Sequence, residues 1–208
     1  MKKKIFSSLQ FKYWLIAQGI VIIIYHGTML ITPFKAVELP MTYVDRLIGF
    51  YSFFTYIYVS FFLQLFIAVV YTDEDISLKC AGAIVLNACI AAPVFYFFPT
   101  TMTAAFFNEG HLTSHFMSVF IRSLDKNYNC FPSIHIANSL VATVYFNVRR
   151  SKPWRMISIL WFVLITWSVI STRQHYFIDV IGGLMVAVTS MSIINRKMFR
   201  NQFDWIKK

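Results

Sequence analysis

Six long runs of mostly apolar residues follow one another along the chain, separated by short polar segments. A helix that crosses a bilayer needs about 20 mostly apolar residues, and the runs are close to that length. We therefore predict membrane-spanning helices at 13–31, 50–71, 80–98, 133–148, 154–171 and 177–194. The longest connection is 99–131. Its stretch 111–124 has apolar residues at helical spacing, which predicts a helix lying flat in the outer membrane interface.

Composition supports this pattern: of the 208 residues, 58% are apolar, 18% are aromatic and only 13% are charged. Soluble proteins carry about 25% charged residues, so this chain cannot cover a soluble globule with polar surface. The same numbers exclude a disordered chain, and three cysteines do not make a disulfide framework. The predicted fold class is all-α, a single polytopic membrane domain over residues 1–208 with six transmembrane helices and an outer interfacial helix.

The basic residues are divided unequally between the two sides that six spans define. Fourteen of the 19 Lys and Arg residues fall on the side of the termini, and the positive-inside rule makes that side cytoplasmic. The outer side carries only Lys35, Arg46, Arg122, Lys126 and Arg173. The net charge of +10 does not indicate a nucleic-acid partner, because the basic residues stand between apolar runs. The compact architecture favours a bacterial inner membrane, with the outer side facing the periplasm.

The first apolar run continues to residue 31, and no small-x-small cleavage site follows it. The apolar core of a signal peptide is only about 7–15 residues long. We therefore expect an uncleaved first helix.

Ionisable residues at membrane depth are costly, so each one is a candidate for function. One cluster opens the fourth predicted helix from the outer side, where Pro132 ends the loop and Ser133 can cap the helix. The free backbone N–H groups of such a helix end form an arrangement that binds phosphate. His135 lies in the first turn, beside this predicted anion site.

A second cluster opens the sixth predicted helix from the same side and contains Arg173, His175 and Asp179. His175 and Asp179 are four residues apart and share one helical face. The carboxylate can accept the Nδ1–H of the imidazole and leave Nε2 as a nucleophile, as the Asp of a hydrolase triad orients its His. One hairpin returns the chain outward between the clusters, so both are expected at one membrane depth.

Together the two clusters predict phosphoryl transfer through a phosphohistidine. His175 is the predicted nucleophile, Asp179 orients it, and His135 protonates the departing alkoxide. Ser133, Arg173 and Arg46 are the predicted substrate-binding residues, with helix amides that stabilise charge on the phosphate. The predicted substrate is a phosphorylated lipid that enters from the outer leaflet.

Two stretches resemble motifs of a known family. Phe131-Pro-Ser-Ile-His135 and Gln174-His-Tyr-Phe-Ile-Asp179 are similar to the second and third motifs of the type 2 phosphatidic acid phosphatase superfamily. The resemblance implies a six-helix core and a metal-independent site without a cofactor, in which a histidine is the nucleophile. The third motif has the form Arg-Gln-His-Tyr-x-x-Asp here, which is more similar to the branch that holds the inositol phosphorylceramide synthases than to the classical lipid phosphatases. Also similar to that branch are Asp45-Arg-Leu-Ile-Gly-Phe50, Asp125 and Asn129.

The chain departs from that family at two places. The usual third motif, Ser-Arg-x5-His-x3-Asp, has an Arg where this chain has Val169. The usual first motif, Lys-x6-Arg-Pro, is not found, and its expected place reads Thr101-Met-Thr-Ala-Ala-Phe106. The cations that bind phosphate must then come from elsewhere, and the candidates are Arg173, Arg46, Arg122 and Lys126.

Several alternatives stay open. The two histidines with Asp179 could form a buried polar network between helices, or the three ligands of a catalytic zinc. His111 and His115 also have chelating spacing, although no Glu follows the first as a zinc protease motif requires. Hydrolysis of a lipid phosphate monoester or diphosphate is favoured, because the outer loop is short for a second large head group. Head-group transfer and a non-enzymatic relic of the fold are the other candidate functions.

Two further patterns concern packing. Gly182 and Gly183 lie inside the sixth predicted helix and are expected to permit close contact with another helix. The aromatic run Phe53-Phe-Thr-Tyr-Ile-Tyr58 is expected to face lipid and the membrane interface.

Overall fold

A computed structural model describes residues 8–102 and 128–194 of the chain. Outside the described residues lie the predicted interfacial helix at 111–124 with His111 and His115, the cations Arg122 and Lys126, and Asp125.

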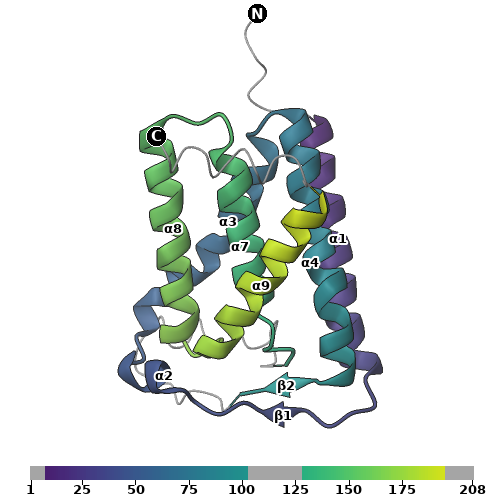
Figure 1. Cartoon of the computed structure of the whole chain (residues 1–208), viewed down its shortest axis with the longest axis vertical. Helices are drawn as coiled ribbons and strands as arrows, with labels where there is room; N and C mark the ends of the chain where they lie inside the picture. Colours follow the sequence, from purple (N-terminus) through teal and green to yellow (C-terminus); the bar gives the residue numbers. More distant parts are fainter. Residues whose placement is uncertain (1–7, 103–127, 195–208) are drawn as a thin grey trace, which may run out of the picture.

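Six long helices make up most of the described part and run between the two ends of the molecule (Figure 1). They are α1 (Ser8–Ile31), α3 (Thr55–Val70), α4 (Glu74–Phe97), α7 (Ile134–Asn147), α8 (Lys152–Ser171) and α9 (Phe177–Ile194). Each corresponds to one predicted apolar run, and the all-α polytopic membrane fold is confirmed. Five of them have the length and hydropathy of a membrane span, with α3 extended by the 3-10 turn η1 (Ser52–Phe54).

The helix α7 is the exception, because its 14 residues rise only about 21 Å. The hydrocarbon core of a bilayer is about 30 Å thick, so α7 is too short to cross it alone. It lies at the centre of the bundle, where α3, α4, α8 and α9 all pack against it, and none of its residues is exposed. Irregular backbone at its ends is acceptable at membrane depth because it is buried in protein. The predicted span at 133–148 is therefore a short central helix.

The helix α4 begins at Glu74, ahead of the start at residue 80 that the apolar pattern predicts. Glu74 and Asp75 occupy its first turn, where acidic side chains interact favourably with the partial positive charge of a helix N-terminus. The prediction missed this turn because its residues are charged.

Polar side chains join α7 to its neighbours inside the bundle. Interhelical hydrogen bonds contribute to association where lipid offers no hydrophobic driving force between helices. The donor–acceptor distances here are 2.5–3.0 Å. Two such groups are Gln64 with Ser139 and Thr143, and Asn87 with Asn138 and Ser190.

A layer of short elements lies across one end of the bundle, at the bottom of Figure 1. It contains α2 (Tyr43–Leu47) and the parallel strands β1 (Val37–Glu38) and β2 (Thr100–Thr101). Before α2, Thr42 accepts from the backbone N–H of Asp45 (3.4 Å), and the Asp45 carboxylate accepts from the N–H of Thr42 (2.7 Å). Both α7 and α9 begin at this end, so the two predicted clusters lie next to this layer.

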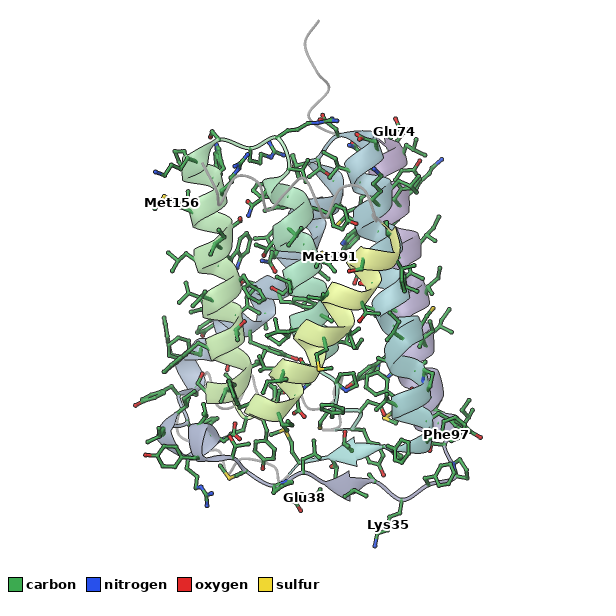
Figure 2. The ribbon with its side chains drawn as sticks, in the orientation of Figure 1. Lys35, Glu38, Glu74, Phe97, Met156 and Met191 are labelled. Carbon is green, nitrogen blue, oxygen red and sulfur yellow. The ribbon has the colours of Figure 1, made fainter. Side chains whose placement is uncertain are left out.

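The opposite end carries the charged turns before α4 and before α8, and Figure 2 labels Glu74 there. Arg149 forms an ion pair with Asp73 (2.7 Å) and lies 3.6 Å from Asp75. The hydrogen bond to Asp73 and the charge of Asp75 raise the pKa of Arg149 above its usual value. At this end, therefore, an ion pair at the surface links the segment before α4 to the segment before α8.

Candidate active site

The start of α7 lies directly against α9, and two glycines make this contact possible. A Cβ atom on Gly183 would stand 2.5 Å from the backbone oxygen of Ser133, and one on Gly182 would stand 2.5 Å from the ring of Phe131. The backbone N–H of Ser133 also donates to the carbonyl oxygen of Asp179 (3.0 Å). The close helix contact predicted at these glycines is confirmed.

This contact brings two imidazoles together. Nδ1 of His135 lies 3.1 Å from Nε2 of His175, which is hydrogen-bonding distance. His175 is buried, whereas His135 is half-buried. The two motifs, 40 residues apart in sequence, therefore meet at one depth.

Asp179 lies on the other side of His175. Its Oδ2 atom is 3.5 Å from Nδ1 of His175 and accepts from the backbone N–H of Tyr176 (2.8 Å). Within the described residues, Nδ1 of His175 and Oδ1 of Asp179 have no hydrogen-bond partner. Since His135 and Asp179 face opposite ring nitrogens of His175, the three side chains do not converge on one point. That geometry does not fit the zinc site considered from the sequence.

Ser133 caps α7, as the sequence predicts. Its Oγ atom accepts from the backbone N–H of Ile136 (3.3 Å), and the residue is buried. The chain enters this cap through the cis peptide bond between Phe131 and Pro132. The cap places the first turn of α7, with His135, beside the turn that precedes α9.

Two aromatic residues of α3 contact the ring of His135. The hydroxyl of Tyr58 is 2.9 Å from Nε2 of His135, and the ring centroids of Tyr58 and Phe61 each lie 5.0 Å from that of His135. Tyr58 is 3% exposed, whereas Tyr56 is 50% exposed. The prediction that this aromatic run faces lipid therefore holds for Tyr56 and is wrong for Tyr58, because residues two apart point about 200° apart around a helix.

Residues 36–193 match the sequence profile of the PAP2 superfamily, and this range contains every element that builds the site. The chain belongs to the PAP2 superfamily. This match confirms the resemblance of the two motifs at superfamily level and supports phosphatase-like chemistry in general. The branch of the inositol phosphorylceramide synthases stays a prediction. No curated protein and no solved structure matches the chain.

In this PAP2 protein, Arg173 is bound to the layer of short elements. Its φ angle is 54°, in the left-handed region, and its guanidinium donates to the carbonyl oxygens of Asp45 (2.8 Å) and Ile48 (3.0 Å). Cations near the last carbonyls of a helix stabilise that helix end. Among the described residues, no hydrogen bond joins Arg173 to either histidine. The phosphate-binding role of Arg173 stays a prediction. In that role, Arg173 would bind phosphate with the guanidinium N–H groups that do not bind Asp45 or Ile48.

Asp45 completes the contact between α2 and the turn before α9. Its buried carboxylate accepts from the backbone N–H of Phe177 (2.8 Å), two residues after His175. We call these bonds of Asp45 and Arg173 the α2 clamp. The neighbouring Arg46 is exposed, and no hydrogen bond or ion pair joins it to the histidines within the described residues.

Sequence reasoning did not predict that Asp45 and Tyr58 belong to the site. The spacing Thr42-x-x-Asp45 is a capping box with Asp in place of Glu, and it could have revealed the helix start at α2. No comparable signal marks Tyr58, because it stands in a run in which aromatic residues point in all directions.

Proposed function

We propose that this PAP2 protein hydrolyses a lipid phosphate monoester or diphosphate, with His175 as the nucleophile. The observation that carries the proposal is the 3.1 Å approach of Nδ1 of His135 to Nε2 of His175. Ionisable groups buried among membrane helices are costly and are usually retained for function. Membership of the superfamily supports phosphatase-like chemistry in general.

In the first half of the proposed reaction, Nε2 of His175 attacks phosphorus. The N–P bond forms, the P–O bond to the lipid breaks, and the leaving oxygen takes the Nδ1 proton of protonated His135. The carboxylate of Asp179, 3.5 Å from Nδ1 of His175, favours the proton on Nδ1 and stabilises the positive charge that develops on the ring. The hydroxyl proton of Ser133 and those N–H groups at the start of α7 that the Ser133 cap does not bind stabilise charge on the other phosphate oxygens.

In the second half, water attacks the phosphorus of the phosphohistidine. His135, now unprotonated at Nδ1, accepts the proton of the water, the N–P bond breaks, and inorganic phosphate leaves. Each residue returns to its starting state. If an alcohol attacks in place of water, the same site becomes a head-group transferase.

We also propose that the site faces the non-cytoplasmic side, in a bacterial inner membrane with the periplasm beyond it. The end opposite to the site carries most of the described basic residues, in the helix ends and the connections between them: Lys12, Lys79, Arg149, Arg150, Lys152 and Arg155. The end with the site, where Figure 2 labels Lys35, has Lys35, Arg46 and Arg173. This asymmetry favours cytoplasmic termini under the positive-inside rule.

The first experiment measures inorganic phosphate released by the full-length protein in detergent. The substrates are a diacylglycerol phosphate, a polyprenyl diphosphate and a water-soluble phosphate ester. We expect release from at least one lipid, and a loss of about 10³-fold or more in His175→Ala, as for other nucleophiles. His26→Ala is the matched control, because His26 lies on α1 outside the site. Equal release from wild type and His175→Ala would contradict the proposal.

A second measurement traps the intermediate. With a ³²P-labelled lipid phosphate, the wild type should acquire an alkali-stable, acid-labile phosphoryl group that His175→Ala lacks. Adding free inositol separates the two reactions, because label that moves to inositol assigns head-group transfer instead of hydrolysis. Absence of both label and released phosphate would favour a non-enzymatic relic of the fold.

A further inference from the structure

Tyr58 contacts the histidine pair from outside both motifs. It lies on α3, 77 residues before His135, and is 3% exposed. Its hydroxyl oxygen is 2.9 Å from Nε2 of His135, the ring nitrogen that does not face His175. Tyr58, His135, His175 and Asp179 thus form one row of polar contacts that crosses from α3 to α9.

The end of this row at Asp179 sets the direction of its hydrogen bonds. A carboxylate only accepts, so its charge favours a proton on Nδ1 of His175, which lies 3.5 Å from Asp179 and makes no hydrogen bond among the described residues. In a neutral imidazole the other nitrogen is then unprotonated, so Nε2 of His175 accepts and Nδ1 of His135 donates. The remaining nitrogen of neutral His135, Nε2, must accept from Tyr58. A phenol hydroxyl can also accept, so the same contact suits the doubly protonated His135 that the proposed reaction uses.

We propose that Tyr58 is a positioning residue that keeps a proton on Nδ1 of His135, directed at the nucleophilic nitrogen of His175. Its effect on rate rests on the proposed function. The location of the proton does not, because it can be measured without a substrate.

Asp179 and Tyr58 both favour this arrangement from the two ends of the row, and without the hydroxyl only Asp179 opposes the other one. His135 would then carry its proton on Nε2, its Nδ1 would accept, and His175 would donate from Nε2. In that state Nε2 of His175 has no lone pair for phosphorus, and its unprotonated Nδ1 faces the carboxylate of Asp179. Tyr58 therefore favours the arrangement that contains a nucleophile.

Nitrogen-15 NMR of the full-length protein, labelled at histidine and held in detergent micelles, distinguishes the two arrangements. Protonated and unprotonated ring nitrogens differ in chemical shift, the chain has only five histidines, and His135→Asn identifies the signals of His135. For neutral His135 we expect the proton on Nδ1 in the wild type and a new Nε2–H population in Tyr58→Phe. A wild-type proton on Nε2, or a Tyr58→Phe spectrum without that population, would overturn the proposal.

Activity provides the second readout. Tyr58→Phe keeps the ring and its packing, and we expect kcat to fall about 10- to 100-fold, as when partners that orient other functional histidines are removed. KM should stay the same, because no proposed phosphate-binding group is changed. Tyr56→Phe removes a half-exposed hydroxyl from the same helix and should leave kcat unchanged. If Tyr58→Phe hydrolyses lipid as fast as the wild type, the proposed effect on rate is overturned. If the wild type itself is inactive, the proposed function is contradicted, and the NMR result alone decides where the proton of His135 lies.

Discussion

The carboxylate of Asp179 lies 3.5 Å from Nδ1 of His175, on the opposite side of that ring from His135. Asp179 is fully buried, and its Oδ2 atom also accepts from the N–H of Tyr176 (2.8 Å). Among the described residues, Asp179 therefore contacts His175 and makes no hydrogen bond to His135. This geometry separates the orientation of the nucleophile from the delivery of the leaving-group proton.

The Asp179→Asn variant tests that separation. Asn can keep an acceptor for Tyr176 but can present an N–H group to His175, which favours the wrong tautomer of the ring. We expect kcat to fall by as much as about 10⁴-fold, as for the equivalent change in a hydrolase triad. Circular dichroism during heating should show a similar melting temperature. Asp75→Asn, an exposed carboxylate at the opposite end, is the control, and an unchanged kcat in Asp179→Asn would contradict the orienting role.

Gly183→Ala tests the contact between α7 and α9. The new Cβ would lie 2.5 Å from the backbone oxygen of Ser133, so one helix must move. Overpacking of this kind costs about 1–3 kcal/mol, and we expect both a lower melting temperature and a lower kcat. Gly19→Ala on α1 is the matched control, because no atom lies within 4 Å of the Cβ that it would add. Equal melting and equal kcat in both variants would show that the contact tolerates a methyl group.

The α2 clamp can be tested at Asp45. This carboxylate accepts from the N–H and the hydroxyl of Thr42 (each 2.7 Å) and from the N–H of Phe177 (2.8 Å). Asp45→Ala removes the acceptor of these part-buried donors, which costs up to about 1–3 kcal/mol for each group that stays unsatisfied. We expect a lower melting temperature and a lower kcat, because the turn that carries His175 loses a contact. Lys35→Ala, an exposed change at the same end, is the control. A lower melting temperature with normal kcat would limit the clamp to stability.

Arg173→Lys distinguishes two roles of the arginine. Lys cannot reproduce the fork that reaches the carbonyl oxygens of Asp45 and Ile48, so we expect a lower melting temperature. If these bonds are the main role of Arg173, inhibition by orthovanadate, which imitates the pentacoordinate phosphorus of the transition state, should be as strong as in the wild type. Weakened inhibition would instead assign a phosphate contact to Arg173, and Lys35→Arg serves as the control at the same end.

The positions of the two histidines could be predicted from the sequence because each depends on local information. Ser133 and His135 stand at a helix start, and His175 and Asp179 stand four residues apart on one helical face. The number of apolar runs between the two pairs then places both pairs at the same side of the membrane. Gly182 and Gly183 gave a further correct signal, since small residues in a membrane helix permit close packing.

The contacts of Tyr58 and Asp45 depend on long-range packing and could not be predicted in this way. The hydroxyl of Tyr58 meets a ring that is 77 residues away, and the carboxylate of Asp45 meets an N–H that is 132 residues away. In ordinary amphipathic helices, polar residues mark the side that faces away from the core. Four of the six residues from Phe53 to Tyr58 are aromatic, so no such contrast indicates which face turns inward.

The position of α7 within the bundle also affects how the surrounding lipid acts on the site. Helices that touch lipid respond to a change in bilayer thickness by tilting. No residue of α7 is exposed, and four of the described helices pack against it, so we expect the bilayer to act on His135 mainly through those neighbours. We therefore expect the outer helices to absorb most of a hydrophobic mismatch, and contacts within the protein to set the depth of the histidine pair.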